Sequence, residues 1–192
     1  MGRRGCGKST LAKKIQDAFP RQIIIDTLHE YEEGEIFYEF NEFADRIGEL
    51  AKTNSDQYKL VLQLAHDDEL AIDTFEQCIR LAHELGNCLI IIEEVQLFSS
   101  HHKLPSQLKN VLLVGRHQNI GLMFTSQRAG EVHKTILSQC GHIFVGQMHE
   151  KNDVSYLKSF FGESAEQLPN LPVHEFIYFQ STGLITRVKN KI

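Results

Sequence analysis

The sequence has 192 residues, of which 42% are hydrophobic and 23% charged, with a net charge of −5 and a pI of about 6.0. This length fits one domain over residues 1–192 with a sizeable core. The acidic balance argues against a strongly basic nucleic-acid binder, so any contact with nucleic acid depends on local patches. No apolar run approaches the roughly 18 residues of a membrane span, and no charged-then-apolar signal segment is visible.

Residues 2–9 match the phosphate-loop pattern G-x-x-x-x-G-K-[ST]. Its glycines let the backbone curl so that N–H groups point at phosphate oxygens, and the following helix N-terminus adds to the attraction. Lys8 is expected to reach the terminal phosphates and Ser9 to hold Mg²⁺. The residues expected to bind the nucleotide are Gly2, Gly5, Cys6, Gly7, Lys8, Ser9 and Thr10.

A phosphate loop normally follows a buried apolar strand that fixes its base, and here only Met1 precedes the pattern. The sequence therefore predicts a core whose first strand is missing. We expect the loop to be poorly anchored as a result.

Strand-like and helix-like apolar patterns alternate along the rest of the chain, which predicts an α/β fold. A helix is expected from the phosphate loop to Pro20, and others near 43–50, 75–85, 105–116, 132–140 and 153–161. Strands are expected at 22–25, 36–40, 59–64, 87–92, 121–125 and 142–145, with a closing hairpin at 175–189 that turns at 181–183. The four cysteines lack metal spacing, so we expect reduced thiols in a cytoplasmic protein.

Two acids, Glu93 and Glu94, directly follow the most apolar strand, residues 88–92. This is the Walker B pattern with an added carboxylate. We assign Glu93 to the Mg²⁺ shell and Glu94 to the water that attacks the terminal phosphate. The alternative is two solvated acids at a strand end.

Two further polar positions lie at or before the next strand. Gln127 follows that strand and is expected to sense the terminal phosphate or orient water, although a plain loop amide is the alternative. Arg116 precedes the strand and is expected to act as an arginine finger for a neighbouring subunit. A surface arginine at a helix end is its equal alternative, and Arg128 is a rival finger.

Taken together, these motifs resemble the FtsK–HerA superfamily of DNA-translocating ATPases. Residues 25–31 also resemble the acid-to-Glu-Tyr stretch of HerA-type enzymes, and the short length is most similar to genome-packaging ATPases of tailless, internal-membrane double-stranded DNA viruses. One departure is the first Walker B acid, which is usually Asp in the family. The segments that carry the resemblance are residues 2–9, 25–31, 91–94, 115–117 and 125–128.

The resemblance implies a RecA-like core with a mostly parallel sheet flanked by helices, a homohexameric ring, ATP with Mg²⁺, and double-stranded DNA pumped through a pore. A capsid or portal-like partner and a place in a host cytoplasm or a virion are further implications. Our first choice for a pore loop is residues 98–104, for which a solvated polar loop is the alternative.

Two other function classes share parts of this pattern. A small nucleotide or nucleoside kinase has the same loop and size, but the chain offers no arginine-rich lid. A nucleotide-binding assembly module without turnover is the other alternative, to which the missing strand lends some weight.

Overall fold

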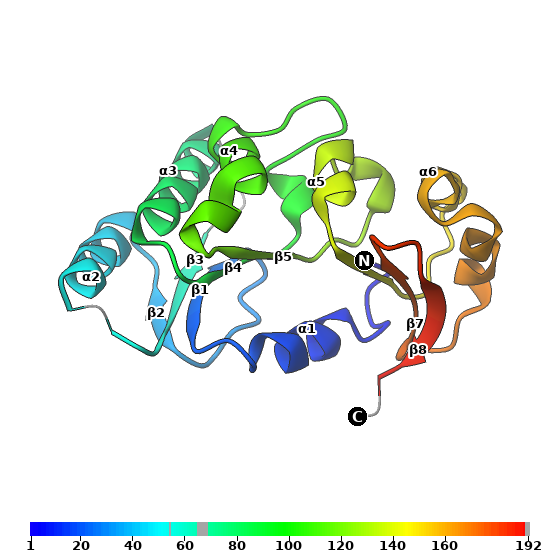
Figure 1. Ribbon diagram of the computed structural model, residues 1–192, viewed down its shortest axis with the longest axis horizontal. Coiled ribbons are helices and arrows are strands. Elements are labelled where there is room, and N and C mark those ends of the chain that lie inside the picture. Colours follow the sequence, from blue (N-terminus) through cyan, green and yellow to red (C-terminus); the bar gives the residue numbers. More distant parts are fainter. Residues whose placement is uncertain (54, 65–68, 191–192) are drawn as a thin grey trace. The chain divides into compact units, whose positions relative to one another are not determined.

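The computed structural model describes residues 1–53, 55–64 and 69–190. These residues form two compact units. The phosphate-loop unit comprises Met1–Lys14, Ser99–Lys103 and everything from Thr125 onward; the sheet unit comprises Ile15–Phe98 and Leu104–Phe124 (Figure 1). The single-domain organisation stays a prediction.

The sheet unit contains five strands in the order β2-β3-β1-β4-β5, and every neighbouring pair is parallel. The strands are β1 (Arg21–Asp26), β2 (Glu35–Phe37), β3 (Tyr58–Gln63), β4 (Leu89–Ile92) and β5 (Gly121–Phe124). The central strands β1 and β4 are buried along almost their whole length, as expected of a parallel sheet. This confirms the predicted mostly parallel α/β core.

Three helices of the sheet unit pack over one face of its sheet (Figure 1). They are α2 (Phe40–Thr53), α3 (Glu69–Leu85) and α4 (Ser106–Val114). Phe75 of α3 stacks on Phe98 with ring centroids 4.1 Å apart, and both rings are buried. Phe98 therefore belongs to the core of this unit, and only residues 100–103 of the expected pore loop are exposed.

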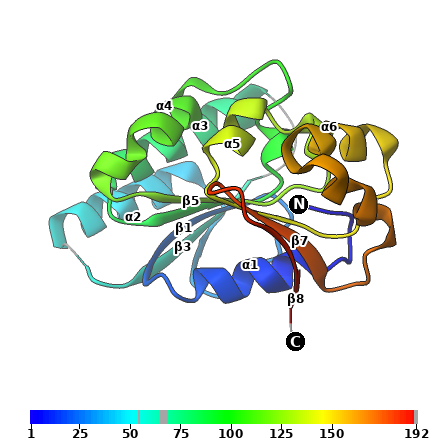
Figure 2. The ribbon, with the colours of Figure 1, turned by 45° about the vertical axis from the view of Figure 1, so that its right-hand side comes forward.

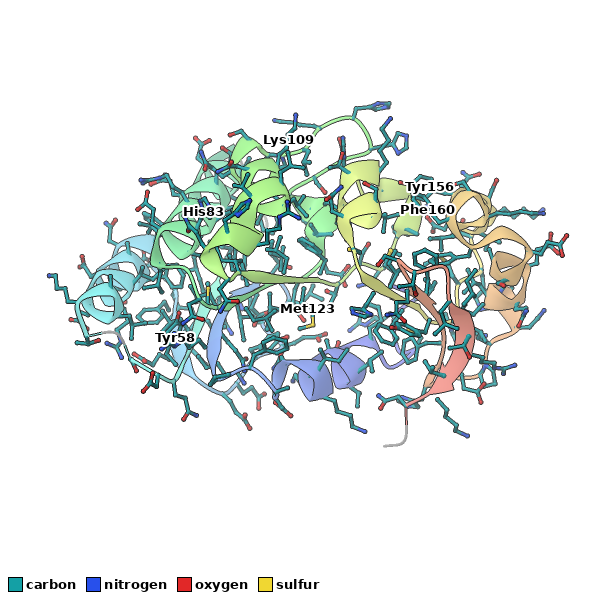
Figure 3. All side chains as sticks on the ribbon, viewed as in Figure 1. Tyr58, His83, Lys109, Met123, Tyr156 and Phe160 are labelled. Carbon is teal, nitrogen blue, oxygen red and sulfur yellow. The ribbon has the colours of Figure 1, made fainter. Side chains whose placement is uncertain are left out.

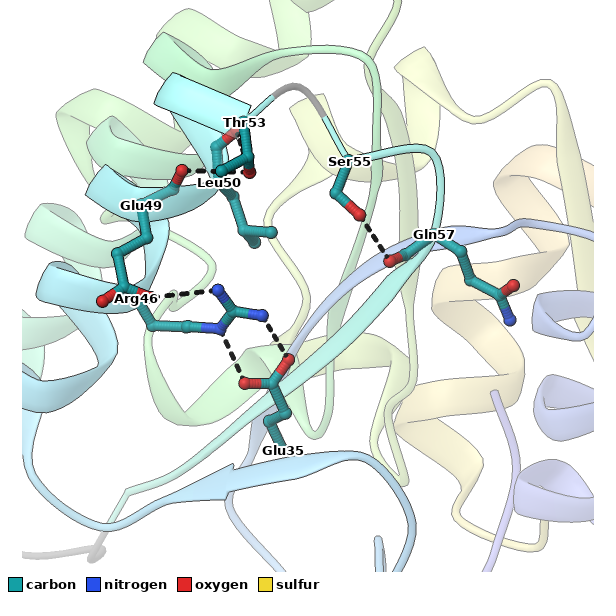
Figure 4. A network of polar contacts seen from close by, with 7 residues as sticks. All are labelled: Glu35, Arg46, Glu49, Leu50, Thr53, Ser55 and Gln57. Carbon is teal, nitrogen blue, oxygen red and sulfur yellow. Dashed lines mark hydrogen bonds and ion pairs between the residues drawn. The ribbon is translucent and has the colours of Figure 1, made fainter.

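A surface ion-pair network connects α2 to the edge strand β2 (Figure 4). Arg46 contacts both carboxylate oxygens of Glu35, with Nε at 2.7 Å and Nη2 at 3.0 Å, and its Nη1 lies 3.0 Å from Glu49. Because all three side chains are partly exposed, the network adds little stability although it joins α2 to β2.

The phosphate-loop unit contains a three-stranded antiparallel sheet in the order β6-β7-β8 (Figure 2). Its elements are β6 (His142–Val145), β7 (Glu175–Gln180), β8 (Ile185–Lys189), α5 (Lys134–Gln139) and α6 (Lys151–Phe161). The predicted hairpin is confirmed, since Gly183 N–H donates to Gln180 at the turn. Tyr156 and Phe160 lie together on α6 (Figure 3).

Several element boundaries differ from the sequence prediction. Helix α1 (Lys8–Gln16) ends well before Pro20, and the strand expected at 36–40 ends at Phe37 because Phe40 already begins α2. Pro105 is extended and precedes α4 rather than opening it. The short helical turns η1 (Val95–Leu97), η2 (Gly115–Gln118), η3 (Ala129–Glu131) and η4 (Gly162–Asn170) were not predicted as separate elements.

No strand is assigned before α1 in the described part of the chain, yet the residues there are hydrogen-bonded on two sides. Met1 bonds to β6 and just beyond it: its amino group donates to Phe144 and its carbonyl accepts from Gly146. Gly2 N–H donates to Ser126, and Arg3 N–H donates to Gln147. The expectation of a poorly anchored loop is therefore wrong, because long-range backbone bonds hold its base.

Among the described helices, none is long and apolar enough to cross a membrane.

Candidate nucleotide-binding and hydrolysis site

The phosphate loop has the curled backbone that its sequence predicts. Gly5 and Gly7 have φ values of 77° and 95°, a left-handed conformation that side chains other than glycine rarely adopt. Lys8 is the first residue of α1, and its Nζ folds back over the loop to donate to the Arg3 carbonyl at 3.3 Å. Ser9 is half-buried and Thr10 is exposed at the start of the same helix.

Cys6 fills the space beneath the loop. Its side chain is fully buried, and a Cβ added to either Gly2 or Gly146 would lie 2.8 Å from its Sγ. The loop can sit this low only because both neighbours are glycines. Cys6 is thus a packing residue of the phosphate loop, and its predicted contact with nucleotide stays a prediction.

The segment that carries Gln127 lies beside the phosphate loop, because Ser126 accepts the Gly2 N–H at 3.2 Å. Within that segment the Ser126 hydroxyl accepts from the Arg128 N–H at 3.1 Å and donates to the Arg128 carbonyl at 3.0 Å. The half-buried Gln127 therefore sits in a fixed turn next to the loop, and its role at the terminal phosphate stays a prediction.

Arg128 makes ion pairs within its own unit. Its Nε donates to Asp153 of α6 at 2.9 Å, and its Nη1 lies 3.7 Å from Glu131. Asp153 is buried and also accepts the Gly130 N–H at 2.8 Å. The Arg128 guanidinium is therefore paired with carboxylates of its own subunit. This pairing disfavours Arg128 as the arginine finger for a neighbouring subunit.

In the sheet unit, the carboxyl ends of β1 and β4 bring two buried acids together. Ile25 pairs with Ile92, so Asp26 and Glu93 follow side by side and their side chains share a hydrogen bond. Asp26 is fully buried and accepts three backbone N–H groups, from Leu28, Glu30 and Tyr31, at 3.0–3.2 Å.

The pKa of Glu93 is raised to about 8. Burial is the largest cause, followed by repulsion from the Asp26 and Glu30 carboxylates. Its Oε2 is buried and has no hydrogen-bond partner among the described residues. Such an orphaned acceptor is rare in folded proteins and suits a cation or a cation-bound water.

Glu94 adopts a left-handed conformation, with φ 46° and ψ 56°, which is unusual for a residue with a side chain. It is 4% exposed, and its Oε2 accepts from Gln96 Nε2 at 2.6 Å. Gln96 thus orients the carboxylate, and backbone strain is retained at the position that the sequence assigns to water activation.

The residues present fit a Mg²⁺ ion held mainly by phosphates. No group of three or more His, Cys, Asp or Glu side chains in the described ranges could hold a metal ion alone. Mg²⁺ bound with a nucleotide needs only one or two protein ligands besides phosphate oxygens and water. Within the phosphate-loop unit the Ser9 hydroxyl, and within the sheet unit the orphaned Glu93 oxygen, are each a ligand type that Mg²⁺ accepts, and their predicted roles stay predictions.

Arg116 lies at the opposite edge of the sheet from the acids. It belongs to η2 and borders a groove of about 540 Å³ at the amino ends of β1, β4 and β5. The side chain is exposed, and the described residues form no ion pair with it. From Cys88 to Glu93 the sheet spans about 17 Å at 3.3 Å per residue, so Arg116 cannot reach the acids of its own sheet.

The rim of this groove is held by two left-handed asparagines. Asn87 and Asn119 have φ values of 48° and 56°, and Asn119 Nδ2 donates to Asn87 Oδ1 at 2.7 Å. The turns before β4 and β5 are therefore joined to each other by this hydrogen bond. This contact also holds the end of η2, the helical turn that carries Arg116.

The parallel sheet and the curled loop define an α/β P-loop NTPase fold. No family model matches this sequence, and no curated protein matches it. Solved structures do: the genome packaging NTPase B204 of Sulfolobus turreted icosahedral virus 2 in complex with ATP-gammaS is 20% identical, with a TM-score of 0.76 over 98% of this chain and 93% of that one.

Two further structures share the fold. B204, the DNA-packaging ATPase of Sulfolobus turreted icosahedral virus, is 22% identical, with a TM-score of 0.72 over 100% of this chain and 95% of that one. VirB4 of Thermoanaerobacter pseudethanolicus is 12% identical, with a TM-score of 0.66 over 100% of this chain and 88% of that one. The expected likeness to FtsK–HerA-type ATPases is confirmed at the level of the fold.

Sequence reasoning missed several residues that shape these sites. Asp26 lies in the 25–31 stretch that carries the family resemblance but received no role of its own, although a lone acid at the carboxyl end of a buried strand is a usable signal. Asp153, Gln96 and His174 carry no local signal, because their partners are distant in sequence or lie in an unpredicted turn.

The raised pKa of Glu93 predicts a pH dependence of stability. Below pH 4.5 the carboxyl is protonated in both the folded and unfolded states; between pH 4.5 and about 8, unfolding releases a proton, so stability falls as pH rises and the loss is complete above 8. The unfolding free energy of Glu93→Gln, relative to that of wild type, should therefore be a few kcal/mol higher at pH 9 than at pH 5.

Chemical unfolding at both pH values tests this, with Glu42→Gln, which removes an exposed carboxyl from α2, as the matched control. A wild type and Glu93→Gln pair whose difference in unfolding free energy is the same at both pH values would contradict the assignment.

Proposed function

We propose that the chain is the ATP-hydrolysing subunit of a motor that packages double-stranded DNA. The observation that carries the proposal is Glu94, a buried carboxylate with a strained backbone that is held by Gln96, two residues after the end of the strand β4. A curled phosphate loop in the same chain and the fold shared with packaging ATPases support it. We also propose membership of the FtsK–HerA superfamily on this basis.

In this proposal, the chain's residues divide the work of hydrolysis. The N–H groups of the phosphate loop and Lys8 Nζ bind the phosphates of ATP. Ser9 and Glu93 hold Mg²⁺, which supplies positive charge beside the phosphates. Glu94 accepts the proton of the attacking water, and Gln127 senses the terminal phosphate.

The paired acids favour water over an alcohol as the acceptor. A kinase needs a site for a second substrate and a lid with arginines, and the described residues near the acids offer backbone N–H groups and amides instead. We therefore favour hydrolysis over the nucleoside kinase alternative. Measurable ATP turnover would distinguish a hydrolase from a nucleotide-binding assembly module without turnover.

We predict that Glu94→Gln lowers ATP turnover by about 100-fold or more, because the amide cannot accept a proton, while the affinity for ATP stays within about threefold. Lys8→Ala should instead weaken ATP binding itself. Steady-state phosphate release and calorimetric titration with Mg-ATP measure the two effects.

Gln96→Glu is a useful companion variant, since it keeps the size of the side chain but places a like charge beside Glu94. Full turnover by Glu94→Gln would remove Glu94 from the mechanism.

If Arg116 is an arginine finger, its position supports action on a neighbouring copy rather than on its own sheet. Arg116 lies near the amino ends of the strands, whereas Glu93 and Glu94 of the same unit follow the carboxyl end of β4. A finger role for Arg116 therefore requires a ring in which one subunit completes the site of the next. We propose a homohexamer, and the implied finger is Arg116 rather than Arg128, whose guanidinium is paired with Asp153.

Complementation tests this arrangement. Arg116→Ala and Glu94→Gln should each be nearly inactive, but an equal mixture should regain about a quarter of wild-type turnover if subunits associate at random, since half the sites keep Glu94 and half of those gain a neighbour's arginine. A mixture as inactive as its components would exclude action between subunits.

The remaining partners follow from the motor. We propose double-stranded DNA as the cargo, with a capsid or portal-like structure as the docking partner, in a host cytoplasm or associated with a virion. The net charge of −5 means that DNA contacts must come from local cations repeated around a ring.

A further inference from the structure

The base of the β7–β8 hairpin reaches the phosphate loop through one residue. His174, which immediately precedes β7, donates its backbone N–H to the Cys6 carbonyl at 3.1 Å. The two residues are far apart in the sequence but belong to the same compact unit. This bond is a direct link between the hairpin and the centre of the loop.

That bond has a consequence for the next residue of the loop. The Cys6 carbonyl and the Gly7 N–H belong to one peptide unit, and in a trans peptide they point in opposite directions. When His174 holds the carbonyl, the Gly7 N–H is turned away from His174. That orientation leaves the N–H free for a phosphate oxygen, as phosphate loops require.

The His174 ring makes a second contact with the same peptide. A Cβ added to Gly7 would collide with His174 Nδ1, so the imidazole lies directly against the Gly7 backbone. That nitrogen is buried and finds no hydrogen-bond partner within the described ranges. The ring therefore restricts the loop sterically.

The backbone of His174 is itself in an unfavourable state that the hairpin maintains. Its φ is 64°, left-handed for a residue with a large side chain. Asn190, which follows β8, donates its N–H to the His174 carbonyl at 2.8 Å and accepts from Lys14 Nζ of α1 at 3.1 Å. Both ends of the hairpin are thus joined to each other and to the loop and its helix.

We propose that His174 is a positioning residue for the phosphate loop: it fixes the Cys6–Gly7 peptide from the base of the β7–β8 hairpin, so that phosphate binding depends on the hairpin. The inference rests on the proposed nucleotide binding and adds a residue outside the sequence motifs. His174 touches the loop rather than the nucleotide, so its loss changes affinity more than the chemical step.

Three variants and a control test the role of the ring. His174→Gly keeps the left-handed backbone but removes the ring, and should raise the Kd and KM for Mg-ATP by about tenfold with kcat within about twofold. His174→Asn, which tolerates the same backbone and refills part of the space, should lie between His174→Gly and wild type. His142→Asn, at the exposed end of β6, should match wild type.

A double-mutant cycle tests the contact itself. Gly7→Ala should reduce ATP affinity in both backgrounds. The fold-loss should be at least about ten times smaller in the His174→Gly background than in wild type, because the colliding ring is gone. Equal factors in both backgrounds, or an unchanged Kd in both His174 variants, would overturn the proposal. If wild type itself fails to bind Mg-ATP, the proposed function fails instead.

Discussion

The burial of two carboxyl groups at the carboxyl ends of β1 and β4 is the constraint around which the sheet unit is arranged. The parallel register of Ile25 with Ile92 forces Asp26 and Glu93 into contact at a point with almost no solvent. Burial disfavours the charged form of Glu93, and repulsion from the Asp26 carboxylate adds to that cost, so the pKa of Glu93 is raised.

The surrounding residues donate hydrogen bonds that stabilise the Asp26 carboxylate, but they leave one Glu93 oxygen without a donor. Three backbone N–H groups and Gln63 Nε2 serve Asp26, whereas Glu93 keeps an orphaned oxygen. A structure that served only stability would have paired both acids or replaced one. The asymmetry favours a cation at Glu93, which agrees with the proposed Mg²⁺ role.

The phosphate-loop unit obtains its order from long-range contacts rather than from the loop's own sequence. Met1 and Arg3 are bonded to β6 and the residues after it, Gly2 to Ser126, and Cys6 to His174. The loop's curl, the turn that carries Gln127 and the base of the hairpin are therefore neighbours by hydrogen bonding. A change at any one of them is expected to reach the others.

The sequence predicted what depends on local pattern. The unbroken apolar run before Glu93 predicted a buried strand, and the glycines of residues 2–7 with Lys8 and Ser9 predicted a phosphate loop. It could not predict pairings across more than a hundred residues, such as Cys6 with His174, since no local preference encodes them. It also missed η4, where Pro169 and a weak apolar pattern hide the helical turns.

The most direct test of a DNA-packaging motor is phosphate release from Mg-ATP, measured against protein concentration with and without double-stranded DNA. For such a motor, the rate per subunit is expected to rise with concentration, as rings assemble, and to rise again when DNA is added. A rate per subunit that neither variable changes, or a terminal phosphoryl group recovered on a nucleoside instead of in inorganic phosphate, would contradict the motor function.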